Sequence, residues 1–102
     1  MALLHIVNKS HFDSSALRSC LRLVKRGSGI LLIEDAVYAA QRTESVNETL
    51  ADAMVESAVY ALEPDILARG IPVERILDEI TLVDYAGFVD LVTQYDNAMS
   101  WL

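Results

Sequence analysis

The chain has 102 residues, and its 15 acidic and 8 basic side chains give a formal net charge of −7 at pH 7. This length has room for a single domain covering residues 1–102. The acidic balance argues against a general nucleic-acid binder, because phosphate contacts require clustered lysines and arginines. Five of the eight basic residues lie in the first 26 positions, which suits electrostatic docking between unlike subunits. They are Lys9, Arg18, Arg22, Lys25 and Arg26.

The only cysteine is Cys20, which excludes an internal disulfide, a CxxC redox motif and a multi-cysteine metal site. No apolar run is long enough to cross a membrane, and the N-terminus lacks the pattern of a signal peptide. We therefore expect a protein of the reducing cytoplasm. The mean hydropathy of +0.30 is high for so short a chain, so part of the apolar surface is expected to meet a partner.

Short apolar runs alternate with segments of helical periodicity. Strands are predicted at residues 3–7, 29–33, 58–62 and 80–83. Asp13 or Ser14 is expected to cap a first helix that ends near Arg26, and further helices are predicted over residues 43–52, 65–69 and 85–95. This alternation predicts an α/β fold with right-handed βαβ units, a mainly parallel sheet of four to five strands and helices on both faces.

The last helix has the clearest periodicity. Its apolar positions follow the i, i+3, i+4 and i+7 spacing of a single stripe, which predicts one side packed on the core. These positions are Tyr85, Phe88, Val89, Val92 and Tyr95. The tail at residues 99–102 is also apolar, and we expect it to dock on the rest of the domain.

Cys20 is the first candidate for chemistry, because thiol chemistry requires a thiolate, which positive charge or a helix N-terminus stabilises. Arg18 and Arg22 are near in sequence, but residues two apart on a helix point to different sides. The neighbours of Cys20 at three and four positions are all apolar: Ala16, Leu17, Leu23 and Val24. Two interpretations stay open, a small buried hydrophobe and a functional thiol.

Two charged patterns each have a plain and a specific interpretation. Four basic residues would share one helix face, which is either solvated or a docking surface for an acidic partner. They are Arg18, Arg22, Lys25 and Arg26. Acidic residues recur every four positions, which predicts either a solvated stripe or a metal site if the helix continues to the last of them. They are Glu44, Glu48, Asp52 and Glu56.

Glu34, Asp35 and Tyr38 follow the second predicted strand, at the end of the sheet where α/β folds bind ligands. The two carboxylates could hold Mg²⁺ as in a receiver domain, or Asp35 could cap the next turn. His5 and His11 have no catalytic or metal partner nearby in sequence. The segment 27–29 (Gly-Ser-Gly) lacks the spacing of a phosphate-binding loop and is interpreted as a turn.

An ordered set of segments along the whole chain resembles the DsrH/TusB family of sulfur-relay subunits. The segments are Leu4-His5, residues 31–40 with Glu34-Asp35-Ala36-Val37-Tyr38, residues 59–62, residues 65–70, Asp84-Tyr85 with Phe88-Val89, and Ser100-Trp101. Ala36 departs from the glycine expected in an Asp-Gly-Val run. The resemblance implies a DsrE/DsrF/DsrH-like fold and a heterohexamer with two copies each of three related subunits, of the DsrEFH or TusBCD type.

The resemblance also implies that, in such complexes, persulfide sulfur passes through cysteines to a small carrier protein of the DsrC/TusE or TusA type. The principal cysteine of the DsrE/TusD subunit lies at the end of the third strand, a few residues before an Arg-Gly pair. Counting back from Arg69-Gly70 places the equivalent position near Leu62, where this chain has no thiol. Cys20 instead matches a cysteine in the first helix of DsrH-type members, which makes it the candidate accessory persulfide cysteine.

The leading hypothesis is therefore a subunit of a cytoplasmic sulfurtransferase complex with DsrE/TusD-like and DsrF/TusC-like partners. At most it is a sulfurtransferase subunit, not a self-sufficient enzyme, and no cofactor, metal, nucleic acid or membrane contact is expected. Cys20 favours dissimilatory sulfur oxidation, with tRNA 2-thiouridine synthesis as the alternative destination. A purely structural subunit and a receiver-like phospho-acceptor centred on Asp35 are the competing hypotheses, and the second is disfavoured because no lysine follows Lys25.

Overall fold

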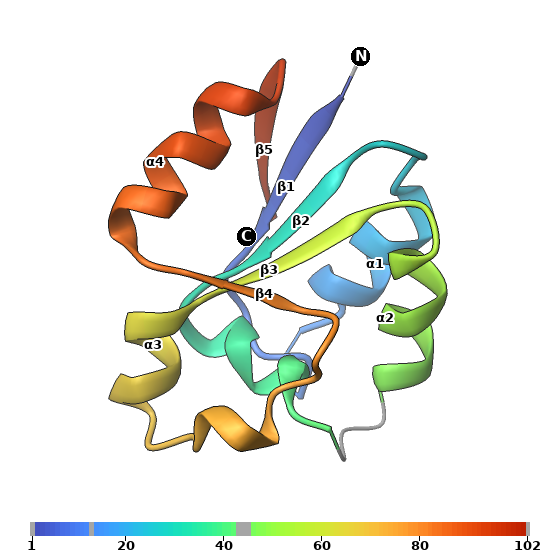
Figure 1. Ribbon diagram of the computed structural model, residues 1–102. Helices are drawn as coiled ribbons and strands as arrows, with labels where there is room; N and C mark the ends of the chain where they lie inside the picture. The colour runs from blue at the N-terminus through green and yellow to red at the C-terminus, as the bar shows by residue number, and fades with distance from the viewer. Residues whose placement is uncertain (1, 13, 43–45, 102) are drawn as a thin grey trace.

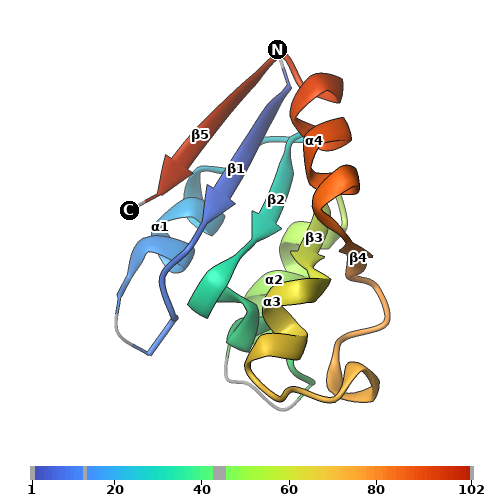
Figure 2. The same cartoon turned by 90° about the vertical axis from the view of Figure 1, so that its left-hand side faces the viewer.

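A computed structural model describes residues 2–12, 14–42 and 46–101. Within them, five strands form one sheet in which every pair of neighbours is parallel, in the order β4-β3-β2-β1-β5 (Figures 1 and 2). The strands are β1 (Leu3–Val7), β2 (Gly29–Leu32), β3 (Ala58–Leu62), β4 (Thr81–Val83) and β5 (Asn97–Trp101). The predicted α/β class with a parallel sheet is confirmed.

Helices lie on both faces of this sheet, as predicted. The α-helices are α1 (Ala16–Leu23), α2 (Asn47–Met54), α3 (Glu63–Ala68) and α4 (Tyr85–Gln94), and two 3₁₀ helices are η1 (Glu34–Ala40) and η2 (Val73–Arg75). Figure 1 shows α1 and α2 on one side of the sheet and α4 on the other, with α3 and the 3₁₀ helices near the carboxyl ends of the strands. No helix within the described ranges is long and apolar enough to cross a membrane.

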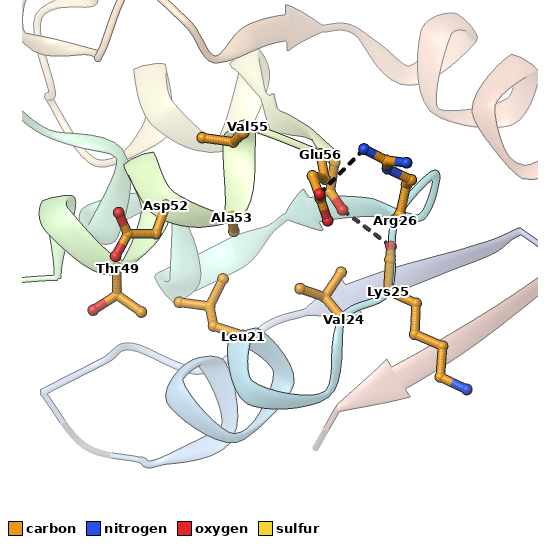
Figure 3. A pocket seen from close by; sticks show the side chains of 10 residues that line it. Leu21, Val24, Lys25, Arg26, Thr49, Asp52, Ala53, Val55 and Glu56 are labelled. Carbon is orange, nitrogen blue, oxygen red and sulfur yellow. Dashed lines mark hydrogen bonds and ion pairs between the residues drawn. The ribbon is translucent and has the colours of Figure 1, made fainter.

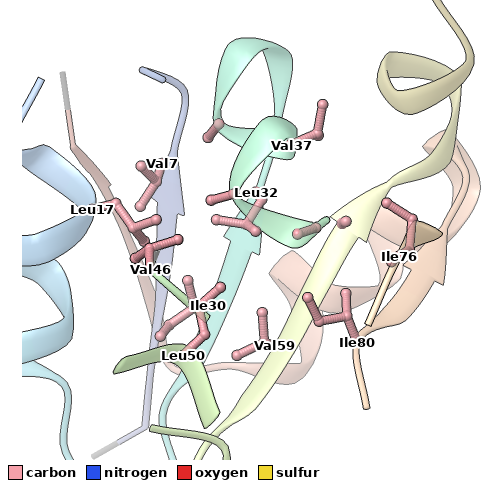
Figure 4. Close-up of a cluster of buried hydrophobic side chains, with 14 of the residues drawn as sticks. Val7, Leu17, Ile30, Leu32, Val37, Val46, Leu50, Val59, Ile76 and Ile80 are labelled. Carbon is pink, nitrogen blue, oxygen red and sulfur yellow. The ribbon is translucent and has the colours of Figure 1, made fainter. Parts of the chain in front are cut away.

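The two faces of the sheet carry unequal cores. The larger core lies on the α1 and α2 side, where side chains of the central strands meet both helices and η1 (Figure 4). All four residues of β2 are buried, which explains its unbroken apolar sequence. The smaller core on the α4 side has only three fully packed members: Leu4, Leu31 and Leu91.

The fifth strand is the sequence's apolar tail. β5 pairs in parallel with β1, placing Met99 opposite His5 and Trp101 opposite Val7. The tail therefore docks, as expected, and it does so by extending the sheet rather than by covering a surface. Its backbone hydrogen bonds, which periodicity alone did not predict, place the first and last strands side by side.

Several helix boundaries differ from the predictions. α1 ends at Leu23 because Val24 turns to extended backbone after its N–H bonds to the Cys20 carbonyl. Lys25 and Arg26 therefore lie beyond the helix, so the predicted four-residue basic helix face is wrong. α2 begins at Asn47 and runs to Met54, later than predicted, and α3 spans residues 63–68. Asp13, Thr43 and Glu44, which entered the helix predictions, lie outside the described residues.

Candidate functional site

The carboxyl ends of β2 and β3 carry a cluster of charged side chains. Immediately after β2, Glu34 adopts a positive φ of 50°, which is unusual for a residue other than glycine. Its backbone N–H donates a hydrogen bond of 2.6 Å to the Asp65 carboxylate, which comes from the start of α3. The first turn of η1 is thereby tied to the helix that follows β3.

Arg69 connects the same two segments. Its Nε and Nη2 atoms each lie 2.9 Å from Oδ1 of Asp35, and its Nη1 donates to the backbone carbonyl of Asp65 at 3.2 Å. Asp35 therefore neither caps the next turn, as one interpretation held, nor stands free as a receiver-like phospho-acceptor. Across the described ranges, no group of three or more histidine, cysteine or carboxylate side chains is arranged to hold a metal ion.

A shallow hollow of about 360 Å³ opens beside this cluster, lined by Ser10, Phe12, Asp35 and Tyr38. The sequence expectation that grouped Asp35 with Tyr38 is correct in space. Phe12 is 68% exposed and packs its ring on His11, with the ring centroids 4.1 Å apart. An exposed aromatic ring beside an ion pair provides a contact surface at this edge, without a nucleophile.

Leu62 occupies the end of β3, the position where the family resemblance locates the principal cysteine of a related subunit. Its side chain is buried, and the residue directly precedes the first turn of α3. Since Cys20 is the only cysteine in the chain, this edge of the sheet carries no sulfur nucleophile. The charged cluster around Asp35 and Arg69 nevertheless remains at the same edge.

Cys20 lies in the middle of α1 with its side chain turned to the larger core. It is fully buried among neighbours that include Leu17 and Leu21. Burial raises the pKa of the Cys20 thiol to about 12, because an apolar environment penalises the charged thiolate. The arginines at positions 18 and 22 are exposed and lie on other sides of the helix. In this isolated chain Cys20 has the surroundings of a buried hydrophobe.

A charged cleft of about 440 Å³ lies between α1 and α2 (Figure 3). Its floor is apolar, formed by Leu21, Val24 and Ala53. Charges of both signs surround it, and the lining residues are Lys25, Arg26, Thr49, Asp52, Val55, Glu56 and Ser57 in addition to the floor. Cys20 faces the core behind this cleft and does not line it.

The charged patterns seen in sequence meet at this cleft. Arg26 pairs with Glu56 at 3.4 Å, and the Gly27 N–H donates to the Glu56 carbonyl at 3.0 Å. The Ser57 hydroxyl donates to the Lys25 carbonyl at 3.1 Å. Of the predicted acidic stripe, Glu48 and Asp52 lie on α2, whereas Glu56 follows its end, as the sequence analysis allowed.

His5 has a partner that its sequence neighbours did not indicate. Its Nδ1 accepts a hydrogen bond of 3.1 Å from the indole N–H of Trp101, so a neutral ring carries its proton on Nε2. His5 is only 4% exposed, and burial lowers the pKa of its imidazole. This pair fastens β5 to β1 and has no catalytic group beside it among the contacts observed.

Sequence reasoning missed three features of these sites: the Asp35–Arg69 ion pair, the Asp65 hydrogen bond and the His5–Trp101 bond. Each joins residues that are more than 30 positions apart. Only the order of the strands brings them together. The one available signal was that Asp65 and Arg69 follow a predicted strand, as Asp35 does, and the carboxyl ends of parallel strands share one edge.

Solved structures with this arrangement of elements are known. The crystal structure of the ychN protein from E. coli matches with a TM-score of 0.85 at 16% identity, covering 98% of both chains. A protein of unknown function from Methanobacterium thermoautotrophicum matches with a TM-score of 0.73 at 13% identity, covering 97% of this chain and 96% of that one. At these identities the two matches establish the fold alone.

Sequence comparison is more specific. Protein TusB of Salmonella dublin and Protein TusB of Salmonella enteritidis PT4 are each 43% identical to this chain over 81 residues. The aligned region covers 79% of this chain and 82% of each relative. The family model described as DsrH like protein matches residues 9–98. The chain therefore belongs to the DsrH-like family of sulfur-relay subunits.

Proposed function

We propose that this chain is an assembly subunit of a cytoplasmic sulfur-relay complex in which the main persulfide cysteine belongs to a different subunit. The observation that carries this proposal is the absence of a cysteine at the carboxyl edge of the sheet. Leu62 is buried at the position where the related DsrE/TusD subunit is expected to hold its cysteine, while the charged cluster around it is intact. In this proposal the edge contributes a charged contact surface, and the sulfur nucleophile comes from a partner subunit.

The partners follow from family membership. A TusB-type subunit is expected to join TusC-like and TusD-like subunits, and we propose a heterohexamer with two copies of each. A small carrier protein of the TusE/DsrC or TusA type then receives the sulfur from the subunit that holds the cysteine. The strongly acidic composition and the large exposed apolar side chains of this chain suit such an assembly.

Cys20 as an accessory persulfide cysteine remains a prediction. In that role its thiolate would attack the outer sulfur of a partner's cysteine persulfide, forming a new S–S bond while the partner's cysteine leaves as a thiolate. A pKa of about 12 keeps Cys20 protonated at neutral pH. The reaction therefore requires that assembly move α1 enough to expose this thiol, which makes a structural role for Cys20 the better-supported alternative.

The destination of the sulfur is proposed from the relatives. Both Salmonella relatives are TusB proteins, which favours tRNA 2-thiouridine synthesis over the sulfur oxidation that the presence of Cys20 suggested. Dissimilatory sulfur oxidation stays the second candidate because the matching family model is DsrH-like. The two destinations require the same subunit contacts and differ in the acceptor protein.

Co-expression with the TusC-like and TusD-like subunits of the same organism tests the proposal. Native mass spectrometry is expected to detect a complex that contains this chain, and the complex is expected to restore 2-thiouridine in tRNA of a bacterium lacking TusB. Cys20→Ala is expected to preserve both results if the thiol is structural. A chain that stays monomeric with these partners would contradict the subunit role.

Persulfide loading separates the two roles of Cys20. The whole complex is incubated with a persulfide donor until the TusD-like cysteine gains one sulfur atom, and the Cys20 peptide is then analysed by mass spectrometry. Added sulfur on Cys20 under these conditions supports the accessory carrier. An unmodified Cys20 beside a loaded partner cysteine excludes that role and leaves the assembly role in place.

A further inference from the structure

Helix α4 is apolar on two adjacent sides, one packed on the sheet and one exposed. Phe88, Leu91 and Tyr95 pack against the sheet in the smaller core. Tyr85, Val89 and Val92 are spaced i, i+4 and i+7 and face away from it, with exposed fractions of 61%, 63% and 40%. We call these three side chains the outer α4 face. Three large apolar residues on one exposed helix face are more than the scattered surface hydrophobes of a monomer.

A continuous apolar face on a helix is normally covered by packing against another element. Here the sheet covers one side, and α4 is the only helix on its face of the sheet in Figures 1 and 2. Ile6 of β1 and Ile33, which follows β2, also belong to the smaller core and are only partly buried. Of the apolar stripe predicted to face the core, Phe88 and Tyr95 pack on the sheet. The other members of the stripe are exposed, and no described residue covers them.

The charged side chains of α4 and its flanking residues are all negative. Asp84, Asp90 and Asp96 are exposed at the start, middle and end of α4. The last basic residue of the chain is Arg75, so residues 76–102 contain acidic side chains without a lysine or arginine. The basic residues of α1 lie on the opposite side of the sheet (Figure 1). A complementary surface is therefore apolar at its centre and basic at its border.

A second copy of this chain fits that description poorly. A two-fold contact between two outer α4 faces would place acidic side chains against acidic side chains, which opposes association. A contact between α4 of one copy and basic α1 of the next joins opposite sides of the sheet. Such a head-to-tail contact either closes as a ring or continues as an open chain of copies.

We propose that the outer α4 face docks an unlike subunit through an apolar surface bordered by lysine and arginine side chains. This inference rests on the proposed sulfur-relay function and identifies the surface through which this chain joins its partners. The apolar centre, Tyr85, Val89 and Val92, supplies burial, and Asp90 beside it selects a basic partner. Asp84 and Asp96 are engaged in bonds to Gly87 N–H and Ala2 N–H, so Asp90 is the acidic residue suited to substitution.

The test uses one pair of matched variants and one charge variant in the co-expressed complex. Val89→Glu introduces a charge at the centre of the outer α4 face. Val55→Glu makes the same change at a residue that is 82% exposed near the α1–α2 cleft, away from α4. Both sites are exposed, so both variants are expected to keep the wild-type circular dichroism spectrum and melting temperature. Asp90→Lys reverses the charge beside the apolar centre.

Affinity for the co-purified TusC-like and TusD-like subunits is measured by titration. Val89→Glu is expected to raise Kd by about tenfold or more, Asp90→Lys to raise it by several-fold, and Val55→Glu to leave it unchanged. Equal affinity for wild type and Val89→Glu overturns the inference while the sulfur-relay function stands. A wild-type chain that binds neither subunit overturns both.

Homo-oligomerisation is checked on the chain alone by light scattering. A wild-type oligomer that Val89→Glu dissociates would assign the outer α4 face to a second copy and overturn the inference. A wild-type monomer that joins the complex through Val89 supports an unlike subunit.

Discussion

Cys20 and His5 are both buried on the α1 side of the sheet, but their surroundings differ: Cys20 lies among apolar side chains, and His5 bonds to Trp101. Cys20 behaves as a small apolar residue with a thiol whose pKa is raised to about 12. We therefore predict that a thiol reagent modifies the native isolated chain at least about 100-fold more slowly than the urea-unfolded chain. Absorbance with Ellman's reagent measures both rates. Comparable rates would indicate that Cys20 is accessible and would strengthen its carrier role.

His5 makes the stability of the chain depend on pH. Its pKa is lowered in the folded state, so on acidification the unfolded chain takes up this proton first. The contribution of neutral His5 is thus complete above about pH 6.5, its unfolded pKa, and decreases as the pH falls from there towards the folded pKa. Protonating Nδ1 also removes the acceptor of the Trp101 N–H.

Urea unfolding at pH 7.5 and 5.5 measures this dependence, with Trp101 as the single tryptophan reporting on β5. In the wild type, the urea concentration at the midpoint of unfolding is expected to be lower at pH 5.5 than at pH 7.5. In His5→Gln, which keeps a side-chain acceptor without a titrating group, the difference is expected to shrink. A wild type and variant with the same pH dependence would assign the acid sensitivity to the many carboxylates instead.

The residues that bring the candidate sites together were only partly predictable. Asp35 and Tyr38 were correctly placed at the carboxyl end of a strand because a buried apolar run ended just before them. Their link to Arg69 could not be predicted, since it depends on β2 and β3 being neighbours in the sheet. The burial of Cys20 was correctly indicated as one interpretation, because apolar neighbours at three and four positions define the side of a helix that faces a core.

At the level of elements, α4 is held to the sheet by a close approach at Gly29. A Cβ atom on this β2 residue would overlap the ring and hydroxyl of Tyr95, which follows α4. The Tyr95 hydroxyl in turn lies 3.3 Å from the Tyr60 hydroxyl on β3. The pKa of Tyr95 is raised mainly by burial and to a smaller extent by this hydrogen bond. The glycine thus makes room for the tyrosine that seats the end of α4.

Gly29→Ala is predicted to destabilise the fold by about 1–3 kcal/mol, the usual cost of forcing extra volume into a packed site. Chemical denaturation measures the loss. Tyr95→Phe removes the atom nearest to the new Cβ, so the double variant is expected to lose less than the sum of the two single variants. Strict additivity in this cycle would place the strain somewhere other than the Gly29–Tyr95 contact.

The sequence predicted the strands better than it predicted the role of the helices. β1 and β3 have the predicted bounds, because unbroken apolar runs between polar segments leave little choice. The i, i+3, i+4 pattern correctly predicted that α4 is a helix, but it did not show which side of the helix faces the sheet. With apolar residues on two sides, only the packing of Leu91 into the smaller core decides which side faces the sheet. β5 escaped prediction because its residues, 97–101, alternate weakly.

The whole molecule has a net charge of −7, and residues 76–102, which include α4, contain acidic side chains without a lysine or arginine. Association with a basic-bordered partner is therefore predicted to be accelerated by long-range attraction, which salt screens. Stopped-flow measurements are expected to give an association rate several-fold lower at about 500 mM than at about 50 mM salt. The dissociation rate is expected to change less. An association rate independent of salt would mean that apolar contact alone guides docking.

The pairing of β1 with both β2 and β5 has a consequence for how the protein is made. Strand β1 precedes the other described strands and pairs with the last of them, β5, and the side chains of His5 and Trp101 bond across 96 positions. During synthesis the edge of β1 stays open until nearly the whole of the described chain has emerged. A nascent or prematurely terminated chain would present that apolar edge to chaperones and proteases. The pairing of β5 with β1 thus covers this edge only after the other strands of the described sheet have been synthesised.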